Sequence, residues 1–254
     1  MRLVSWNVNG IRAAIRNGFW QWLSADAPDI LCLQETRIHD EQLTAKMRTP
    51  PGYVTFWHSA QQKGYSGVAT FCKQSPLAVR EGFGRCRFDI EGRVLVTEHP
   101  TFTLINAYFP SGRRGHERVE CKLEFYDALL EYCSQLQEQG HRLVVCGDYN
   151  TAHQALDLAR PSQNKRTSGF LPEEREALSH WLDSGFVDIF RYLHPGSREY
   201  TWWTYRFDAR ARNVGWRIDY FLVAKELVPH VQEARILGDV MGSDHCPIGL
   251  EVDL

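Results

Sequence analysis

The segment from residue 102 to 147 decides the predicted fold, because two strand-like runs in it flank one long amphipathic helix. The runs are FTLINAY (102–108) and RLVVCG (142–147), whose apolar and β-branched residues are typical of buried strands. One face of the segment 117–139 is apolar at helical spacing and consists of Val119, Leu123, Tyr126, Leu130 and Cys133. Gly140 follows as a helix stop, so the order of the elements predicts a β–α–β unit.

A second unit of the same kind is predicted near the N-terminus. Residues 3–7 and 29–34 have strand-like patterns, and residues 11–23 between them have a helical one. A further helix is predicted to begin at Pro172, with two glutamates in its first turn and Gly185 beyond its end. Two β–α–β units flanked by more strand pairs predict an α/β protein in which two β-sheets pack face to face, with helices outside.

Length and composition predict one globular domain spanning residues 1–254. The chain of 254 residues contains no linker, repeat or low-complexity tract, and its 43% hydrophobic and 24% charged residues are ordinary for a globular protein. No segment approaches the ~20 apolar residues of a membrane span, and the N-terminus lacks the apolar core of a signal peptide. The seven cysteines are scattered and form no C-x-x-C pair, which predicts a reducing cytoplasm and no membrane contact.

Basic residues are concentrated in two stretches, although the formal net charge is only −2. The two stretches contain Arg113, Arg114, Arg118 and Lys122, and then Arg206, Arg210, Arg212 and Arg217. They could form a local face that attracts phosphate groups on a nearly neutral body. Ordinary solvated loops explain the same pattern, and charge alone favours the loops.

Polar residues that can take part in catalysis or metal binding follow the apolar strand runs. They are Asn7, Glu35, Tyr108, Asp148 with Asn150, and Asp219, which precedes the last such run. Side chains at several strand ends can converge on one rim of a rigid scaffold. GSDH (242–245) adds an adjacent Asp244 and His245 in a glycine-containing loop. Each residue alone also fits a turn or a surface position, so only their combination predicts a site.

The combination favours a hard divalent cation. Mg²⁺ prefers carboxylate and amide oxygens, so Glu35, Asn7 and Asp244 are a suitable ligand set. The cysteines and histidines have no zinc-site spacing, and the chain contains neither a P-loop nor a G-x-S-x-G motif. A nucleoside triphosphatase and a serine hydrolase are therefore disfavoured.

Seven segments, in order, resemble the exonuclease III family of AP endonucleases. They are SWNVNGIRA (5–13), LCLQE (31–35), GYSGVA (64–69), NAYFP (106–110), GDYNTAH (147–153), NVGWRIDYF (213–221) and MGSDHCPI (241–248). NVGWR and DLARP (157–161) resemble the DNA-repair branch in particular. The resemblance implies a four-layer α/β sandwich and Mg²⁺-dependent hydrolysis, with Mn²⁺ as a substitute ion, of the phosphodiester 5′ to an abasic site. It also implies 3′→5′ exonuclease or 3′-end-cleaning activity.

The resemblance also assigns roles to individual residues. Asp148 and Asn150 would activate water, His245 steadied by Asp219 would donate to the phosphate, and Tyr108 would add a donor. The metal set implied is Glu35, Asn7 and Asp244, extended by Asp148, Asn150 and His245. The DNA contacts implied are Arg12, Tyr65, Arg114, Arg118 and Asn164, with Trp202, Trp216 and Ile218 forming an apolar pocket for the abasic sugar. The expected partner is double-stranded DNA with abasic or damaged 3′ sites, bound by a monomer.

Four positions depart from some relatives. Asn9 replaces an aspartate near the metal, which makes a second ion less expected, and Ser111, Thr167 and Arg206 alter groove positions. Two other functions remain open at this point. The scaffold could serve a phosphodiesterase for RNA or another phosphoester, or a non-catalytic DNA-binding module.

Overall fold

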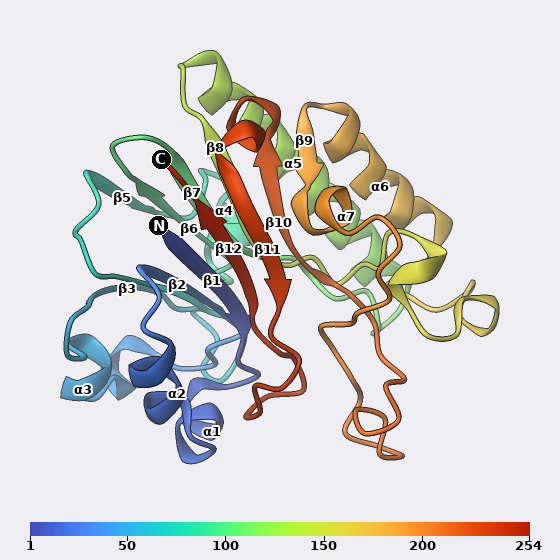
Figure 1. The fold of residues 1–254 in the computed structure, drawn as a ribbon, viewed down its shortest axis with the longest axis horizontal. Helices are drawn as coiled ribbons and strands as arrows, with labels where there is room; N and C mark the ends of the chain where they lie inside the picture. Colours follow the sequence, from blue (N-terminus) through green and yellow to red (C-terminus); the bar gives the residue numbers. More distant parts are fainter.

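The computed structural model describes residues 1–254 as two six-stranded mixed sheets packed face to face (Figure 1). The first sheet has the order β11 (Val231–Ile236), β12 (Ile248–Val252), β1 (Arg2–Asn7), β2 (Ile30–Gln34), β4 (Val68–Cys72) and β3 (Val54–His58). The second has the order β5 (Ala78–Glu81), β6 (Val94–Glu98), β7 (Thr103–Tyr108), β8 (Leu143–Asp148), β10 (Asp219–Ala224) and β9 (Phe186–Asp188). In each sheet only the two central strands, β1–β2 and β7–β8, are parallel.

Helices connect both parallel pairs, as a β–α–β unit requires. The predicted helix between the strands of the second sheet is confirmed as α5 (His116–Glu138). The prediction of one continuous helix over residues 11–23 was wrong, because α1 (Ile11–Arg16) and α2 (Phe19–Asp26) are separate. Gly18 lies between them with φ 99°, a left-handed conformation that ends a regular helix and starts a new direction.

The helices cover the outer faces of the two sheets, which confirms the four-layer sandwich. The remaining elements are α3 (Ala45–Arg48), α4 (Cys86–Asp89), α6 (Pro172–Asp183), α7 (Ile189–Leu193) and the 3₁₀ turns η1 (Asp40–Gln42), η2 (Ala155–Asp157), η3 (Pro161–Gln163) and η4 (Lys225–His230). Helices α1 and α2 pack on the first sheet, whereas α5 and α6 pack on the second (Figure 1). The start of α6 at Pro172 is as predicted. No helix is long and apolar enough to cross a membrane.

Alternating strand residues explain why the strand runs are apolar on both faces. Leu3 and Cys32 point between the sheets, whereas Val4 and Leu31 pack against α1 and α2 on the outside. Between the sheets they meet Leu104 and other residues of the second sheet. Apolar contacts fill most of both faces, and polar strand residues buried between the sheets, such as Gln34 and Asn106, hydrogen-bond to each other.

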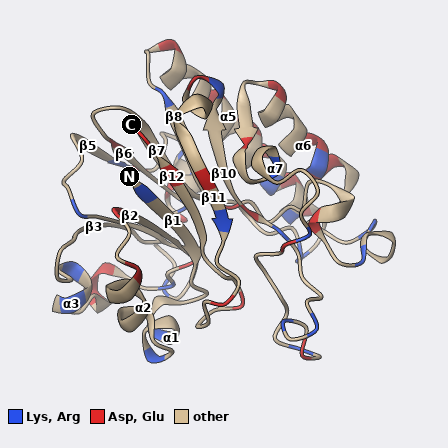
Figure 2. Ribbon diagram, viewed as in Figure 1, with Lys and Arg blue, Asp and Glu red and all other residues tan.

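The two basic stretches do not form one uniform surface, which corrects the simple charge pattern of the sequence. Lys122 and Arg217 are almost completely buried in ion pairs, the first with Glu174 at 2.8 Å and the second with Asp157 at 2.8 Å. The other arginines of the second stretch lie on the long loop between α7 and β10 (Figure 2). Each stretch therefore contains structural and surface cations together.

Candidate active site

Strand pairing brings the polar strand ends to one rim of the sandwich. Tyr108 and Asp148 end the parallel neighbours β7 and β8 and pair directly, and Asp219 begins the antiparallel β10 opposite Asp148. In the first sheet Asn7 ends β1 and Glu35 directly follows β2. The carboxyl ends of parallel strands share an edge, so these five side chains approach one another although they come from distant parts of the chain.

Local backbone conformations aim the two key carboxylates. Gly147 has φ 140°, and a Cβ atom there would lie 1.8 Å from the carbonyl oxygen of Ala107, so only glycine lets β8 lie this close to β7 before Asp148. Asn150 and Glu35 both have left-handed backbones, with φ 51° and φ 54°. Such conformations are uncommon outside glycine and cluster at functional sites.

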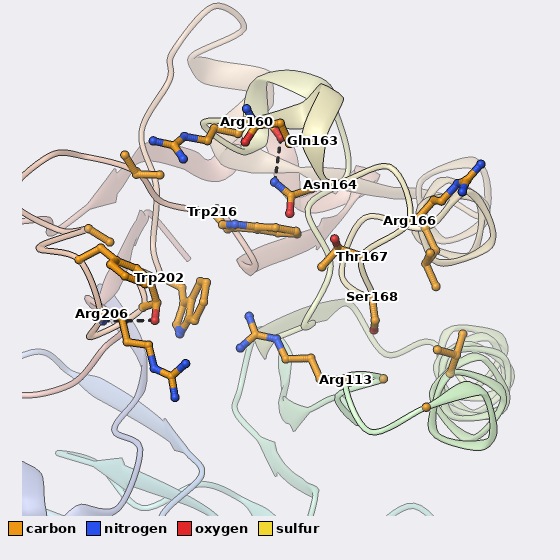
Figure 3. A pocket seen from close by; sticks show the side chains of 18 of the residues that line it. Arg113, Arg160, Gln163, Asn164, Arg166, Thr167, Ser168, Trp202, Arg206 and Trp216 are labelled. Atoms are coloured by element: carbon orange, nitrogen blue, oxygen red, sulfur yellow. Dashed lines mark hydrogen bonds between the residues drawn. The ribbon is translucent and has the colours of Figure 1, made fainter.

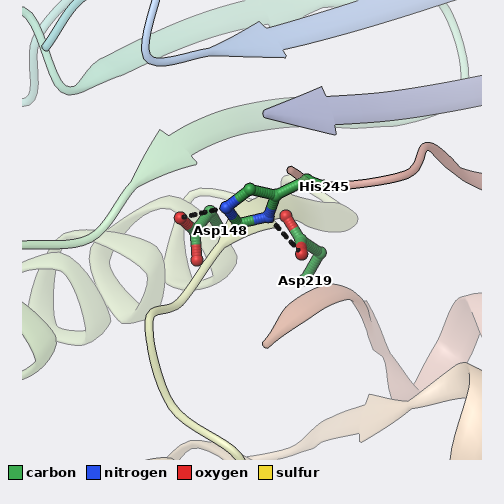
Figure 4. A group of neighbouring side chains, drawn as sticks. All are labelled: Asp148, Asp219 and His245. Carbon is green, nitrogen blue, oxygen red and sulfur yellow. Dashed lines mark hydrogen bonds and ion pairs between the residues drawn. The ribbon is translucent and has the colours of Figure 1, made fainter. Parts of the chain in front are cut away.

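A buried carboxylate–imidazole–carboxylate cluster forms the centre of the rim (Figure 4). The His245 Nδ1–H donates to Asp219 Oδ2 at 2.9 Å, and His245 Nε2 lies 3.9 Å from Asp148 Oδ2. The exposed fractions of Asp148, Asp219 and His245 are only 1%, 3% and 4%. Asp219 Oδ1 is buried without a hydrogen-bond partner. The cluster therefore carries two acidic groups for one basic group, in a site that water scarcely reaches.

This imbalance of charge shifts the pKa of both reactive groups. Burial, reinforced by the negative charge of Asp219, raises the pKa of Asp148 to about 7. Burial alone would lower the pKa of His245, but the carboxylates of Asp219 and Asp148 raise it to about 10. A general base that titrates near neutrality thus lies beside an imidazolium that keeps its proton.

Amide groups fix the orientation of Asp148. Its Oδ1 accepts from the Asn150 backbone N–H at 2.8 Å, and its Oδ2 accepts from Asn7 Nδ2 at 2.8 Å and Asn150 Nδ2 at 3.2 Å. The Asn150 carbonyl in turn accepts from buried Lys122 Nζ at 2.7 Å. The carboxylate is therefore held rigidly from both sheets and from helix α5.

Carboxylates suited to a hard divalent cation border the same pocket. Glu35, Asp148 and Asp244 all line it, and each presents oxygen atoms. Glu35 Oε1 accepts from the Arg37 guanidinium, and Glu35 Oε2 accepts from Asn7 Nδ2 at 3.2 Å. The donor set fits the predicted ion, with Glu35 and Asp244 as its most accessible carboxylates.

Two predicted ligands have different surroundings from those expected. The Asn7 side-chain oxygen accepts from the Asn9 backbone N–H at 2.9 Å, so Asn7 turns its nitrogen to the carboxylates and links Glu35 to Asp148. His245 belongs to a compact group with Asp148 and Asp219 whose ligand atoms lie within 4.8 Å of one another. Asp219 holds the imidazole through Nδ1, so Nε2 is the His245 atom that faces Asp148.

Tyr108 is supported by a buried arginine that the sequence did not indicate. Arg93 donates from Nη1 to the Tyr108 carbonyl at 2.9 Å and from Nη2 to the Tyr65 hydroxyl at 2.7 Å. Arg118 Nη2 donates to the same Tyr65 hydroxyl at 3.1 Å. Burial and the nearby Glu35 charge raise the pKa of Tyr108 well above its usual value, so its hydroxyl stays a neutral donor.

Two adjoining pockets contain most of the predicted DNA contacts. The reactive pocket, of about 500 Å³, is lined by Tyr65, Arg114, Arg118, Trp202 and Ile218 beside the catalytic cluster. The larger pocket, of about 960 Å³, is lined by Asn164, Trp202, Trp216 and five arginines: Arg113, Arg160, Arg166, Arg206 and Arg212 (Figure 3). Arg113 and Trp202 line both pockets and thus form the wall between them.

Comparison with known proteins identifies this arrangement. The model of the Endonuclease/Exonuclease/phosphatase family matches residues 4–245, nearly the whole chain. The chain belongs to this family. Its carboxylate–imidazole cluster, with the metal-competent carboxylates and the two pockets, is therefore the candidate site for cutting a phosphoester bond.

Three relatives define the branch of the family. An exodeoxyribonuclease of Bacillus subtilis is 45% identical over 256 residues, covering all of both chains. The DNA repair nuclease APEX1 of Danio rerio is 43% identical, covering 98% of this chain and 81% of the relative. The solved structure of an AP endonuclease from Archaeoglobus fulgidus is 28% identical with a TM-score of 0.90 and covers all of both chains. All three act, by name, on nucleic acid or in its repair.

The fold brings most of the predicted site residues together in or beside the two pockets. Arg12, which is exposed on α1, lines neither of the two pockets, and neither do the buried Asn7 and Asp219, which hydrogen-bond to Asp148 and His245 from behind. The sequence did not predict Arg37 and Arg93 as site residues, and it indicated Arg113 only as part of a basic stretch. Arg37 and Arg113 each stand within two residues of a predicted site residue, which is a weak signal, whereas nothing in the strand run around Arg93 indicates that its guanidinium turns inward.

Proposed function

We propose that this chain is a Mg²⁺-dependent DNA-repair nuclease that hydrolyses the phosphodiester 5′ to an abasic site. We include in the proposal 3′→5′ exonuclease or 3′-end-cleaning activity at the same site. The observation that carries the proposal is the buried Asp148–His245–Asp219 cluster, in which a carboxylate with a pKa near 7 faces a protonated imidazole. Hydrolysis of a phosphodiester needs both a base for water and a cationic donor for the phosphate.

The protein residues divide the hydrolytic step between them. Asp148 accepts a proton from water as the water oxygen bonds to phosphorus and the bond to the 3′ oxygen breaks. His245 donates to a non-bridging oxygen, and Asp219 holds the imidazole with its Nδ1–H engaged and its Nε2 directed to the pocket. Tyr108 contributes a second neutral donor. The leaving 3′ oxygen takes up a proton from solvent water and becomes a hydroxyl, and the other product carries a 5′-terminal sugar-phosphate.

The metal and the apolar wall complete the proposal. Glu35, with Asp244 and Asp148, would hold Mg²⁺, which would supply positive charge against the phosphate and the leaving oxygen. Ile218 with Trp202 and Trp216 belongs to one apolar cluster next to the catalytic groups, which suits a sugar that has lost its base. An abasic nucleotide enters such a pocket with the least unstacking cost.

The expected partner is double-stranded DNA with an abasic or damaged 3′ site, bound by a monomer. The five arginines of the larger pocket support a polyanionic partner. We further propose that the protein acts in the cytoplasm, bound to the nucleoid if its source is a prokaryote.

A substrate panel tests the reaction. The purified protein is incubated with duplexes that carry an abasic analogue, a uracil, a recessed 3′ end or no lesion, and with RNA and an inositol phosphate. Incision beside the abasic analogue in Mg²⁺ and none in EDTA is expected. Faster turnover of RNA or of the inositol phosphate would replace the proposed substrate, and no cleavage of any substrate would leave a DNA-binding module.

A substitution of Glu35 tests metal binding independently of turnover. Glu35→Ala should weaken Mn²⁺ binding, measured by calorimetry, and lower incision by orders of magnitude while abasic duplex binding in EDTA persists. Glu41→Ala is a matched control, because Glu41 is an exposed carboxylate on η1 paired with Lys63. Unchanged Mn²⁺ affinity in the Glu35 variant would exclude Glu35 as a ligand.

A further inference from the structure

Arg113 occupies an unusual position in the wall between the two pockets. It lies in the loop between β7 and α5, and its guanidinium carbon is 4.3 Å from the centre of the Trp202 ring (Figure 3). The side chain is exposed and ends in no ion pair with a carboxylate. Its planar cationic group therefore has Trp202 as its main partner.

The Trp202 ring is fixed on its other sides. Its Nε1–H donates to Asp244 Oδ2 at 3.0 Å, and its backbone forms bridges with Trp216 and His245. The ring also packs against the apolar cluster that contains Ile218. Because the ring cannot turn away, the face next to Arg113 is a fixed aromatic surface that opens to both pockets when Arg113 leaves.

We propose that Arg113 is a specificity-determining residue, whose guanidinium covers the stacking face of Trp202 against nucleotides that still carry a base. This inference rests on the proposed function and names how its site distinguishes substrates. A base that enters the pocket would stack on Trp202 and must first displace Arg113. An abasic sugar has no flat ring, so it leaves the stacked pair in place.

The two competing interactions are of comparable strength. Stacking of a guanidinium on tryptophan and stacking of a base on tryptophan stabilise by similar amounts. The loss of the first contact can therefore offset the gain of the second. Covering the ring therefore removes much of the gain that a base would obtain there, without blocking the pocket. The charge of Arg113 also stays available to a neighbouring phosphate, so Arg113 need not weaken the binding of abasic DNA.

Arg114 offers a matched control in the adjacent position. It is also exposed and carries the same charge, but it lines only the reactive pocket and is not stacked on Trp202. Removing Arg114 should lower the rates on all duplexes alike through lost phosphate attraction. Removing Arg113 should change the balance between substrates.

The experiment compares kcat/KM on a duplex with an abasic analogue and on an undamaged recessed 3′ end, for the full chain in Mg²⁺. In Arg113→Ala the ratio of abasic to exonuclease rates should fall about 2- to 30-fold, the range that a stacking contact of this kind spans. The ratio for Arg113→Lys, which keeps a cation without the planar group, should lie between those of Arg113→Ala and the wild type. Arg114→Ala should leave the ratio unchanged.

Three results are distinguishable. A lower ratio in Arg113→Ala alone supports the inference. An unchanged ratio, with both rates reduced as in Arg114→Ala, would make Arg113 a simple phosphate contact and overturn it. Absence of abasic incision in the wild-type protein would overturn the proposed function itself, and with it this inference. Melting temperatures of the variants should equal that of the wild type, because both arginines are exposed.

Discussion

Two buried charge clusters lie two residues apart along the chain and behave in opposite ways. Asp219 belongs to the catalytic cluster with Asp148 and His245. Arg217 belongs to a network in which it pairs with Asp157 at 2.8 Å and with Asp188 at 2.6 Å, while Arg191 pairs with Asp157 at 2.6 Å. The network matches two carboxylates with two guanidinium groups, whereas the catalytic cluster has two carboxylates for one imidazole.

The difference teaches that burial alone does not make a site reactive. Although burial opposes ionisation, Arg217 holds the pKa of Asp157 below its usual value, and Asp188 and Asp157 raise the pKa of Arg217 well above its own. The network is therefore locked in its charged form. In the catalytic cluster burial, together with the unmatched charge of Asp219, instead raises the pKa of Asp148 to about 7, where it can exchange a proton during turnover.

The largest expected effect comes from neutralising the excess carboxylate. Asp148→Asn should lower incision by about 10²- to 10⁴-fold, because the base for water is lost. The melting temperature should stay level or rise, since the repulsion between Asp148 and Asp219 is removed. Rates on the abasic duplex and thermal unfolding in EDTA measure the two effects. A large fall in melting temperature would mean that Asp148 is held by matched charges after all.

The matched network should respond in the reverse manner. Arg217→Met leaves Asp157 and Asp188 buried with one guanidinium fewer, which should lower the free energy of unfolding by about 3–5 kcal/mol. Activity per folded molecule should be nearly unchanged. Denaturant unfolding followed by activity at low temperature checks both statements. Arg198→Met is the control for charge loss, because Arg198 is exposed and lines neither pocket. A catalytic defect in fully folded protein would break the distinction between the clusters.

A smaller effect is expected from the coupling inside the catalytic cluster. His245→Asn and Asp219→Asn should each cost roughly 10²-fold in rate, because the donor to the phosphate is lost or left without its partner. The double variant should lose much less than the product of the single losses. Rates for the wild type and the three variants form the cycle, and multiplicative losses would show that the two residues act separately.

The smallest effect is a difference in pH dependence between activity and stability. Below pH 7 the carboxylate of Asp148 takes up a proton, so log(kcat/KM) should decrease as pH falls, with a limiting slope of one per pH unit. Above about pH 10 His245 loses its proton, so log(kcat/KM) should decrease again as pH rises. Because the pKa of Asp148 is higher in the folded state than in the unfolded state, the contribution of Asp148 to stability should rise as pH falls from 7 to 5, whereas burial lowers the pKa of His99 to about 4, so its contribution falls over the same range. Asp157 has a lowered pKa, so its contribution is lost only in stronger acid.

Measurements of kcat/KM and of melting temperature in EDTA over pH 5–11 test these signs together. Between pH 7 and pH 5 the melting temperature of the wild type should rise relative to that of Asp148→Asn, in which the other groups are unchanged, while activity falls; this result would support the unmatched cluster. Parallel loss of activity and stability over that range would indicate that acid simply unfolds the protein.

The sequence by itself determined the local elements and most of the reactive residues. The spacing of apolar residues marks the helix around Tyr126 and the strands that flank it, and polar residues at strand ends mark Asn7, Glu35 and Asp148. These signals are readable because periodicity and strand ends are properties of short segments. The break at Gly18 was missed, since one glycine in a helical pattern does not by itself decide between a kink and an end.

Only the tertiary structure decided which charges are matched. Lys122 and Arg217 look like surface cations in the sequence, yet both are buried, and Asn7 reaches Asp148 across 141 residues. The pKa of Asp148 and the stacking of Arg113 on Trp202 likewise depend on groups that folding brings together from distant segments. Electrostatic energy depends on distance in space and on exclusion of water, and neither quantity exists until the two sheets have packed.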